Sequence, residues 1–317
     1  MKQRPKKYWI WLLVILAVVI PSYLFYNLGF QWDYALELRT MKLLAMIVVG
    51  CCVAYATVAF QTITNNRILT PSLMGYEAVY LLFQTILVFA YGTETFHILN
   101  TLDNFILSIF FMIGFSFLLF YLILRKGKNN IFLLLLIGLV AGILFESMSS
   151  FMQMLIDPND FFIIQNKMFA SFNRINIDIL TYSIVLMVPT LIIGFRFNKK
   201  LDVMALGREQ AISLGVNYNK AVISILILIS ILIAISTALV GPLTFLGLIV
   251  ANLSYEVTKT YKHQVIMIVS CLISVAVVVG GQFIVEQLLN LSTPISSIIN
   301  LIGGVYFMML LLKVKKI

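Results

Sequence analysis

The residues of this sequence that could do chemistry are few and scattered. Among 317 residues there are three cysteines and two histidines: Cys51, Cys52, Cys271, His97 and His263. They form no cluster with carboxylates at the spacing of a metal site, and all three cysteines lie in apolar runs, where small buried thiols are usual. Neither G-x-x-x-x-G-K-[ST] nor G-x-G-x-x-G occurs, so no phosphate-binding loop is encoded. We therefore expect no metal, no cofactor and no enzymatic activity in this chain.

Two carboxylates, Glu77 and Glu146, interrupt apolar runs. A charge at membrane depth costs roughly 2.5–3.5 kcal/mol on insertion scales, so such residues usually face a bundle interior or a water-filled path. Glu146 belongs to a polar, methionine-rich strip within residues 145–154, whose candidate pathway-lining residues are Glu146, Ser147, Ser150 and Met154. A protonated or hydrogen-bonded glutamate between helices is an equal alternative. Gly138 and Gly142, four residues apart on the same predicted helix, favour close helix packing.

The elements that must position these residues are membrane helices. Hydrophobic residues make up 61% of the chain and charged residues only 11%, with a mean hydropathy of +1.02. Runs of about 20 apolar residues cross a bilayer as helices. The sequence predicts an all-α polytopic membrane protein, a single permease domain over residues 1–317. Its ten spans are expected at about 8–28, 40–62, 73–91, 104–124, 131–155, 178–196, 219–240, 244–258, 264–285 and 296–312. The stretch 156–177 between the fifth and sixth spans is expected to be irregular.

The distribution of basic residues predicts the orientation of these spans. With the N-terminus inside and strict alternation, only four of the 22 lysines and arginines lie outside: Arg39, Lys42, Lys167 and Arg174. We therefore expect both termini in the cytoplasm, and we attribute the net charge of +9 to membrane orientation rather than to nucleic-acid binding. Arg39 and Lys42 form a basic pair at the outer mouth of the second span, for which snorkelling to the membrane surface is the ordinary explanation.

A short charged segment interrupts the apolar sequence on the predicted inner side. Residues 205–215 read Ala-Leu-Gly-Arg-Glu-Gln-Ala-Ile-Ser-Leu-Gly. We expect two short helices within about 201–217, the first capped by Asp202, a break at Gly207, and a C-terminal cap at Gly215. An apolar side is supplied by Met204, Leu206, Ala211, Ile212 and Leu214. It suits a cleft on a cytoplasmic partner or the lipid surface, and from the residues alone the lipid surface is the more common outcome.

This segment resembles the coupling segment of the FecCD-type permeases, which are the membrane subunits of ABC importers for iron–siderophore complexes, haem and vitamin B12. That segment typically reads Ala-Leu-Gly-Glu-x-x-Ala-x-x-Leu-Gly. Six positions match it, whereas Arg208 replaces the common Glu and is followed by Glu209; the matching residues are Ala205, Leu206, Gly207, Ala211, Leu214 and Gly215.

Other stretches resemble the same family in the expected order. Arg39-Thr-Met-Lys42 is similar to Arg-Leu-Pro-Arg, and Gly241-Pro-Leu-Thr-Phe-Leu-Gly-Leu248 is similar to Gly-Pro-Ile-x-Phe-Val-Gly-Leu. The family's Gln-x-x-x-x-Asn-Pro motif is matched by Gln61 and Asn66, with Arg67 in place of Pro. Ala251-Asn252 stands where the family usually has Pro-His, whereas Thr293-Pro294 and Ile302–Phe307 resemble its C-terminal motifs.

The resemblance implies a ten-helix fold of two inverted repeats, similar to the vitamin B12 permease. Pro71–Gly75 and Pro242–Gly247 share a Pro-to-Gly pattern that weakly supports such a repeat. It also implies a bacterial cytoplasmic-membrane permease subunit of an ATP-driven importer of iron(III)–siderophores, of the catecholate type. Its implied partners are a second permease, with a heterodimer favoured, two ATPase subunits that bind ATP and Mg²⁺, and an extracellular substrate-binding lipoprotein.

Residue roles follow from the same resemblance. It implies that Arg39 and Lys42 dock the binding protein, that Asn66 and Ile68 line a cytoplasmic gate, and that the strip around Glu146 lines the pathway. It also implies ATPase contact for Ala205, Leu206, Gly207, Arg208, Glu209, Ala211, Leu214 and Gly215. The alternative is an ion- or proton-coupled secondary transporter with Glu77 and Glu146 as coupling carboxylates. A secondary transporter, however, has no need of the segment 205–215.

Overall fold

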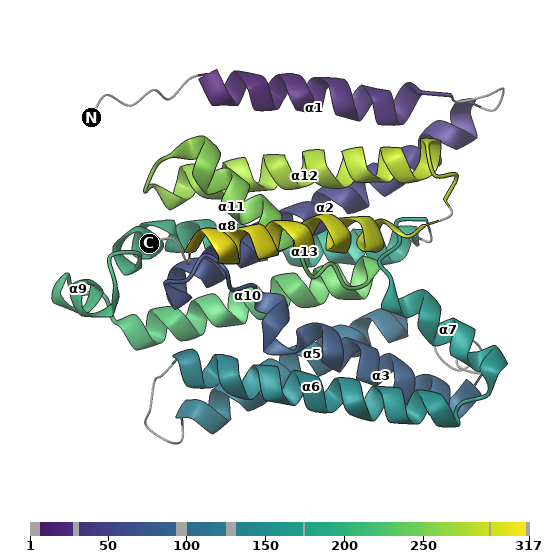
Figure 1. Ribbon diagram of the computed structural model, residues 1–317, viewed down its shortest axis with the longest axis horizontal. Helices are drawn as coiled ribbons and strands as arrows, with labels where there is room; N and C mark the ends of the chain where they lie inside the picture. The colour runs from purple at the N-terminus through teal and green to yellow at the C-terminus, as the bar shows by residue number, and fades with distance from the viewer. Residues whose placement is uncertain are drawn as a thin grey trace.

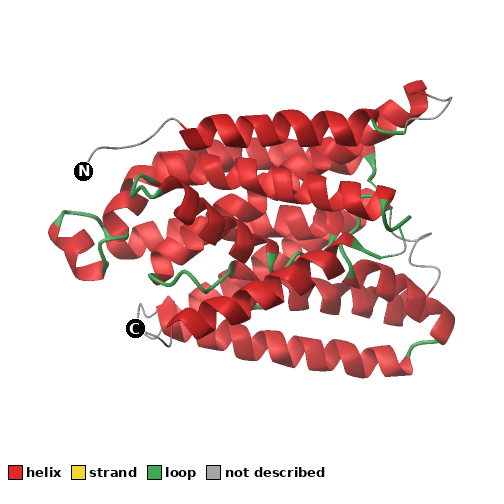
Figure 2. Ribbon diagram, turned by 45° about the horizontal axis from the view of Figure 1, so that its top comes forward, coloured by secondary structure: helices red, strands yellow, loops and turns green. Residues whose placement is uncertain are grey.

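The computed structural model describes residues 7–27, 32–92, 100–124, 131–173, 175–291 and 293–314. Across these ranges every regular element is a helix, as Figure 2 shows. His97 and Arg174 lie outside the described residues. Most helices run side by side along one direction, and α1 begins and α13 ends at the end of the bundle from which α9 projects (Figure 1).

Ten long helices occupy the ten predicted spans in the described part of the chain. They are α1 (Lys7–Phe25), α2 (Trp32–Thr64), α3 (Tyr76–Tyr91), α5 (Thr101–Leu124), α6 (Ile131–Leu155), α8 (Ile177–Met204), α10 (Tyr218–Val240), α11 (Leu246–Thr258), α12 (His263–Gln287) and α13 (Ile295–Val314). By length and composition α2, α5, α6, α8, α10 and α12 can cross a membrane, whereas the apolar helices α1, α3, α11 and α13 are shorter. The all-helical, polytopic fold class is therefore confirmed.

Three short helices complete the described elements: η1 (Pro71–Met74), α7 (Pro158–Met168) and α9 (Arg208–Ser213). The helix α7 corrects the prediction that residues 156–177 are irregular. Its start carries an ordinary signal, because the side chain of Asp157 accepts a hydrogen bond from the N–H of Asn159 and proline follows at the first helical position.

The central element is α2, which packs against α8, α10, α11 and α12. From Ala45 to Thr64 every residue of α2 is buried except Ile47 and Cys51. This part of α2 contains four alanines and Gly50, and in lipid such small residues permit the close backbone approach that favours helix association. A helix of 33 residues is about 50 Å long at 1.5 Å per residue, so α2 exceeds the roughly 30 Å hydrocarbon core of a bilayer.

The two halves of the chain repeat one pattern of contacts. The helices α3, α5 and α6 contact one another, and so do α11, α12 and α13. The predicted Pro-to-Gly segments, Pro71–Gly75 and Pro242–Gly247, lead into α3 and α11. The second segment also contacts α3, because the Thr244 hydroxyl donates to Glu77 Oε2 at 2.6 Å. These contacts agree with the predicted internal repeat.

The glycine pair on α6 allows backbone-to-backbone packing, as predicted. A Cβ on Gly138 would lie 3.1 Å from Met74 Cα, and one on Gly142 would lie 3.1 Å from Gly75 Cα. The segment η1 therefore lies directly on the backbone of α6. Gly75 itself has φ of +82°, a left-handed conformation that favours glycine.

Candidate functional site

The segment 201–217, called the coupling segment below, begins as the end of a long helix. The helix α8 runs unbroken to Met204, so the predicted first short helix is only its last turn, and Asp202 is not an N-cap. Instead, Asp202 Oδ1 accepts from the backbone N–H of His263 at 2.6 Å and contacts its Nδ1 at 2.7 Å. The Asp202 prediction was wrong because its carboxylate has a partner on another helix.

The turn and the second short helix form as predicted. Gly207 has φ of +104° and precedes α9. At the other end the N–H of Gly215 bonds the carbonyl of Ile212 at 2.9 Å, and the N–H of Val216 bonds that of Ala211 at 3.0 Å. With Gly215 at φ +82°, this is the Schellman arrangement. The two glycines thus bound a compact projection on the bundle, residues 205–215, which we call the knob.

The apolar residues of this knob divide into a buried and an exposed set. Met204 and Ala211 are buried at 1% and 0% exposure, so they hold the knob to the bundle rather than face a partner. Leu206, Ile212 and Leu214 are 59%, 52% and 63% exposed, and we call these three residues the docking ridge. In Figure 1, α9 projects beyond the ends of the long helices. The ridge is therefore accessible at the tip of the molecule.

Residues 65–70, which include Asn66 and Ile68, form the loop after α2, and we call it the gate loop. Asn66 Oδ1 accepts from the N–H of Ile68 at 2.9 Å, which closes a tight turn. The carbonyl of Arg67 accepts from Gln61 Nε2 at 2.6 Å and from Asn252 Nδ2 at 3.1 Å. The gate loop is thereby held to α2 and α11.

Two of the departures from the family pattern, Arg67 and Asn252, thus meet in the structure. The guanidinium of Arg67 also lies 4.6 Å from the centroid of the Tyr255 ring on α11, within the range of a cation–π contact. Sequence reasoning missed Tyr255, for which no local motif gives a signal. Asn252 was visible only as a departure from the family pattern.

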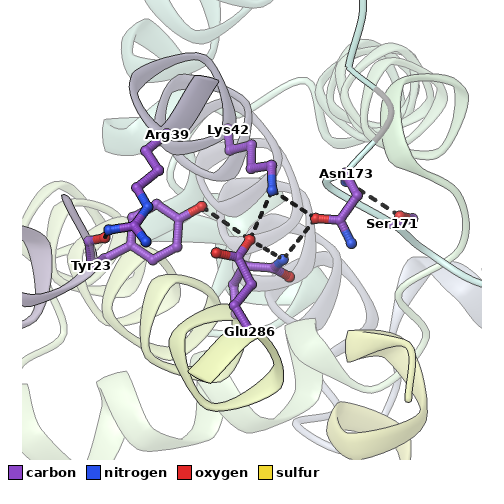
Figure 3. Close-up of polar contacts among 7 residues, drawn as sticks. Tyr23, Arg39, Lys42, Ser171, Asn173 and Glu286 are labelled. Carbon is purple, nitrogen blue, oxygen red and sulfur yellow. Dashed lines mark hydrogen bonds and ion pairs between the residues drawn. The ribbon is translucent and has the colours of Figure 1, made fainter. Parts of the chain in front are cut away.

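The predicted docking cations at the other end of α2 already have partners within the chain (Figure 3). Arg39 Nη1 donates to the carbonyls of Tyr23 and Leu24 at 3.1 Å and of Tyr26 at 2.7 Å, and so caps the end of α1. Lys42 Nζ lies 2.8 Å from Asn173 Oδ1 and 2.9 Å from Glu286 Oε1. A role in docking the binding protein stays a prediction, whereas a role in joining helices is visible.

Glu286 is the centre of this network. Its Oε1 accepts from Lys42, from Gln282 Nε2 at 2.8 Å and from the Tyr23 hydroxyl at 3.3 Å. The network joins α1, α2 and α12 to the stretch that follows α7. The available sequence signal was an acid on the same predicted membrane face as Lys42, but its pairing was not foreseeable.

We expect Glu286→Gln to lower the free energy of unfolding by about 2 kcal/mol, because a hydrogen bond to a charged group contributes about 1.5–3 kcal/mol. Thermal unfolding of the detergent-solubilised protein measures this loss. Glu37→Gln is the matched control, since Glu37 is an exposed acid near the start of α2. Equal stability of the two variants would contradict the structural role of Glu286.

The predicted pathway strip lies on the surface of the single chain. Glu146, Ser147, Ser150 and Met154 are all exposed, Met154 at 83%. The interior face of α6 carries Ser149 instead, whose hydroxyl lies 2.7 Å from that of Thr85 on α3. Within this chain Glu146 is therefore not held between helices, and both its role in lining a pathway and its burial between helices of an assembly stay predictions.

These features define a class: a polytopic, all-helical integral membrane permease with a glycine-bounded knob at one end. Among the described residues no group of three or more His, Cys, Asp or Glu side chains is placed to hold a metal ion. The chain belongs to the FecCD transport family, whose profile matches residues 8–313. It is therefore a transport subunit of an ABC importer rather than an enzyme, and family membership decides against the secondary-transporter alternative.

Three curated relatives are similar over most of their length. The Bacillus subtilis petrobactin import system permease protein YclO is 51% identical over 96% of this chain and 97% of its own. The Bacillus anthracis permeases FatC and FatD, also named for petrobactin import, are 35% and 29% identical, covering 98% and 88% of this chain and 90% and 81% of their own. Among solved structures, an inward-facing metal-chelate type ABC transporter superposes with a TM-score of 0.83 at 22% identity, covering 96% of this chain and 98% of the other. That likeness confirms the fold.

Proposed function

We propose that this permease imports the iron(III) complex of a catecholate-type siderophore, and that the siderophore is petrobactin. The observation that carries this proposal is the 51% identity to YclO, which extends over nearly the whole of both chains. FatC, a second relative named for petrobactin import, matches over a similar extent. A substrate pathway is built from helices along the whole chain, so similarity of two relatives over the full fold supports a shared substrate.

The docking ridge supports a role for the coupling segment in contacting an ATPase. Ala205, Leu206, Gly207, Arg208, Glu209, Leu214 and Gly215 form the exposed or turn-forming part of the knob, with Ala211 buried beneath it. Three exposed apolar side chains on a rigid, capped turn are suited to a complementary cleft. In this proposal ATP and Mg²⁺ bind to two ATPase subunits, and this chain holds no cofactor.

The exposed strip on α6 supports a partner permease. A carboxylate and two serines on a membrane-spanning face are costly in lipid, so this face requires a second protein or a water-filled path. A permease dimer with Glu146, Ser147, Ser150 and Met154 along its central pathway meets both requirements. We favour a heterodimer, because Bacillus anthracis FatC and FatD are two different permeases named for one import system.

The proposed sides of the membrane for the termini, the gate loop and the binding protein follow from the orientation of the bundle. The start of α1 and the end of α13 lie at the same end of the bundle as α9, which supports cytoplasmic termini if the coupling segment is cytoplasmic (Figure 1). The gate loop with Asn66 and Ile68 then lies at the inner end of the pathway. An extracellular substrate-binding lipoprotein would deliver the siderophore at the opposite end, where Arg39 and Lys42 lie.

Complementation tests the proposed substrate. We expect this chain, expressed in a Bacillus subtilis strain that lacks YclO, to restore uptake of radioactive iron given as ferric petrobactin. The matched control is a ferric hydroxamate siderophore, whose uptake should not depend on the chain. Partner mismatch is excluded by repeating the assay in liposomes with the chain's own ATPase, binding protein and second permease. A chain that inserts yet moves no ferric petrobactin in either setting would contradict the proposal.

A further inference from the structure

A series of three polar side chains, partly exposed at Asp202 and buried at the other two, joins the coupling segment to the gate loop through a third helix. It consists of Asp202 near the end of α8, His263 at the start of α12 and Thr62 in the last turn of α2. Asp202 Oδ1 contacts His263 Nδ1 at 2.7 Å, and His263 Nε2 contacts Thr62 Oγ1 at 2.8 Å. His263 and Thr62 are 4% and 7% exposed, so water does not compete freely for the bond between them, whereas the Asp202 side chain is 30% exposed.

Hydrogen-bond donors and acceptors are strongly constrained in this three-residue link. An ionised carboxylate only accepts, so His263 Nδ1 carries a proton toward Asp202, to which the backbone N–H of His263 also donates at 2.6 Å. At the other nitrogen the Thr62 hydroxyl can donate to His263 or to the carbonyl of Val58, which lies 2.8 Å away. Both ring nitrogens of His263 therefore have hydrogen-bond partners, Asp202 on α8 and Thr62 on α2. Movement of either helix would thus displace the imidazole ring.

The two ends of this three-residue link lie at the coupling segment and at the gate loop, which the proposed function requires to move together. Asp202 lies two residues before the end of α8, where the coupling segment leaves the bundle. The carbonyl of Thr62 accepts from the N–H of Asn65 at 3.2 Å, where the gate loop leaves α2. A displacement of the knob therefore acts on the base of the gate loop through two side-chain contacts.

A second contact ties the far end of the coupling segment to the same turn of α2. The hydroxyl of Tyr218, the first residue of α10, donates to the carbonyl of Ile63 at 3.4 Å. Both ends of the coupling segment thus hold the last turn of α2.

We propose that Asp202, His263 and Thr62 are positioning residues that make the gate loop follow the coupling segment during ATP-driven transport. This inference rests on the proposed function, because it needs an ATPase at the docking ridge and a gate at residues 65–70. Coupling between two sites requires a physical element that both sites bias, and this three-residue link is such an element.

Two threonine variants test the link, Thr62→Val and Thr64→Val. Thr64 is also buried in the last turn of α2, but its hydroxyl bonds only carbonyls of its own helix, at Phe60 and Gln61. Both variants lose an intrahelical hydrogen bond, whereas only Thr62→Val loses the link and a side-chain contact with Tyr255 on α11. Tyr255→Phe removes that second contact alone and should leave the ratio unchanged. The assay uses the complete importer in liposomes and measures iron–siderophore transported per ATP hydrolysed.

We expect Thr62→Val to lower this ratio about tenfold relative to Thr64→Val, within the usual range of coupling between sites. Thr62→Ser should restore it, and ATP hydrolysis itself should persist. Equal ratios for the two valine variants, in an importer whose wild type transports, would overturn the link alone. A wild type that moves no siderophore with ATP would overturn the proposed function and the link together.

Distances measured between spin labels on the coupling segment and the gate loop and a fixed site report movement directly. A general loss of stability would not produce the expected difference between these two distances. In the wild type both label distances to a fixed site on α5 should change on ATP binding. In Thr62→Val only the coupling segment should move. Simultaneous movement of both segments in that variant would refute the link.

Discussion

Replacing Leu214 by aspartate should abolish ATP-driven uptake while the protein still inserts and folds. Leu214 is 63% exposed at the end of α9 and belongs to the docking ridge. Its backbone N–H bond to the Gln210 carbonyl, at 3.0 Å, does not depend on the side chain, so the knob keeps its shape. A carboxylate placed in an apolar cleft must lose its hydration without gaining a partner. We expect ATPase binding to weaken about 100-fold, the loss typical of an interface hot spot.

Retention of the ATPase on the purified permease, measured together with uptake, checks this expectation. Asn219→Asp is the matched control. Asn219 is exposed just beyond the coupling segment, so this substitution adds the same charge outside the docking ridge. The result also separates the two interpretations of the ridge. If it only rests on lipid, Leu214→Asp leaves ATPase retention unchanged, and the proposed coupling role would be wrong.

The second large effect is expected from Gly142→Leu on α6. A Cβ at this position would lie 3.1 Å from Gly75 Cα, and Gly75 belongs to a turn that cannot yield easily because its φ is +82°. The added side chain must push η1 and α6 apart, and overpacking of this kind costs typically 1–3 kcal/mol. Because the obstacle is backbone rather than a flexible side chain, we expect a loss of about 3 kcal/mol, at the upper end of that range.

Unfolding by SDS in mixed micelles measures this loss, and Gly114→Leu is the control. Gly114 is also an interior glycine of an apolar helix, α5, but nothing lies within 4 Å of a Cβ built on it. Both substitutions gain the same helix propensity, so their difference reports the contact with η1 alone. If Gly142→Leu were as stable as Gly114→Leu, the close approach of α6 and η1 would not contribute to the fold.

Much of the fold could be predicted because its signals are local. Hydropathy over contiguous residues located all ten long helices, and Gly207 and Gly215 located the turns of the knob. A left-handed glycine at a helix end is encoded at one position, so a single sequence reveals it. The capping signal of α7 was equally local and was overlooked, since Asp157 and Pro158 stand side by side.

The candidate site was less predictable because its side-chain partners are far apart in the chain. Asp202 resembles a helix cap in sequence, but its partner His263 is 61 residues away. Lys42 resembles a free docking cation, but Glu286, 244 residues away, accepts its hydrogen bond. Residue type determines what a side chain can bind, whereas the packing of helices determines which partner it meets.

The sequence by itself thus determined the class of protein, the number and order of the long helices, and the position of the knob, but not the limits of those helices, because α2 begins at Trp32 and α8 continues to Met204. Only the tertiary structure decided which of its apolar residues are exposed, which face of α6 is buried, and how Asp202, His263 and Thr62 meet. The physical reason is that the hydropathy of a span and the backbone conformation of a glycine turn depend only on residues close together in the sequence. Burial and hydrogen bonding depend instead on contacts between helices, and no single helix encodes them.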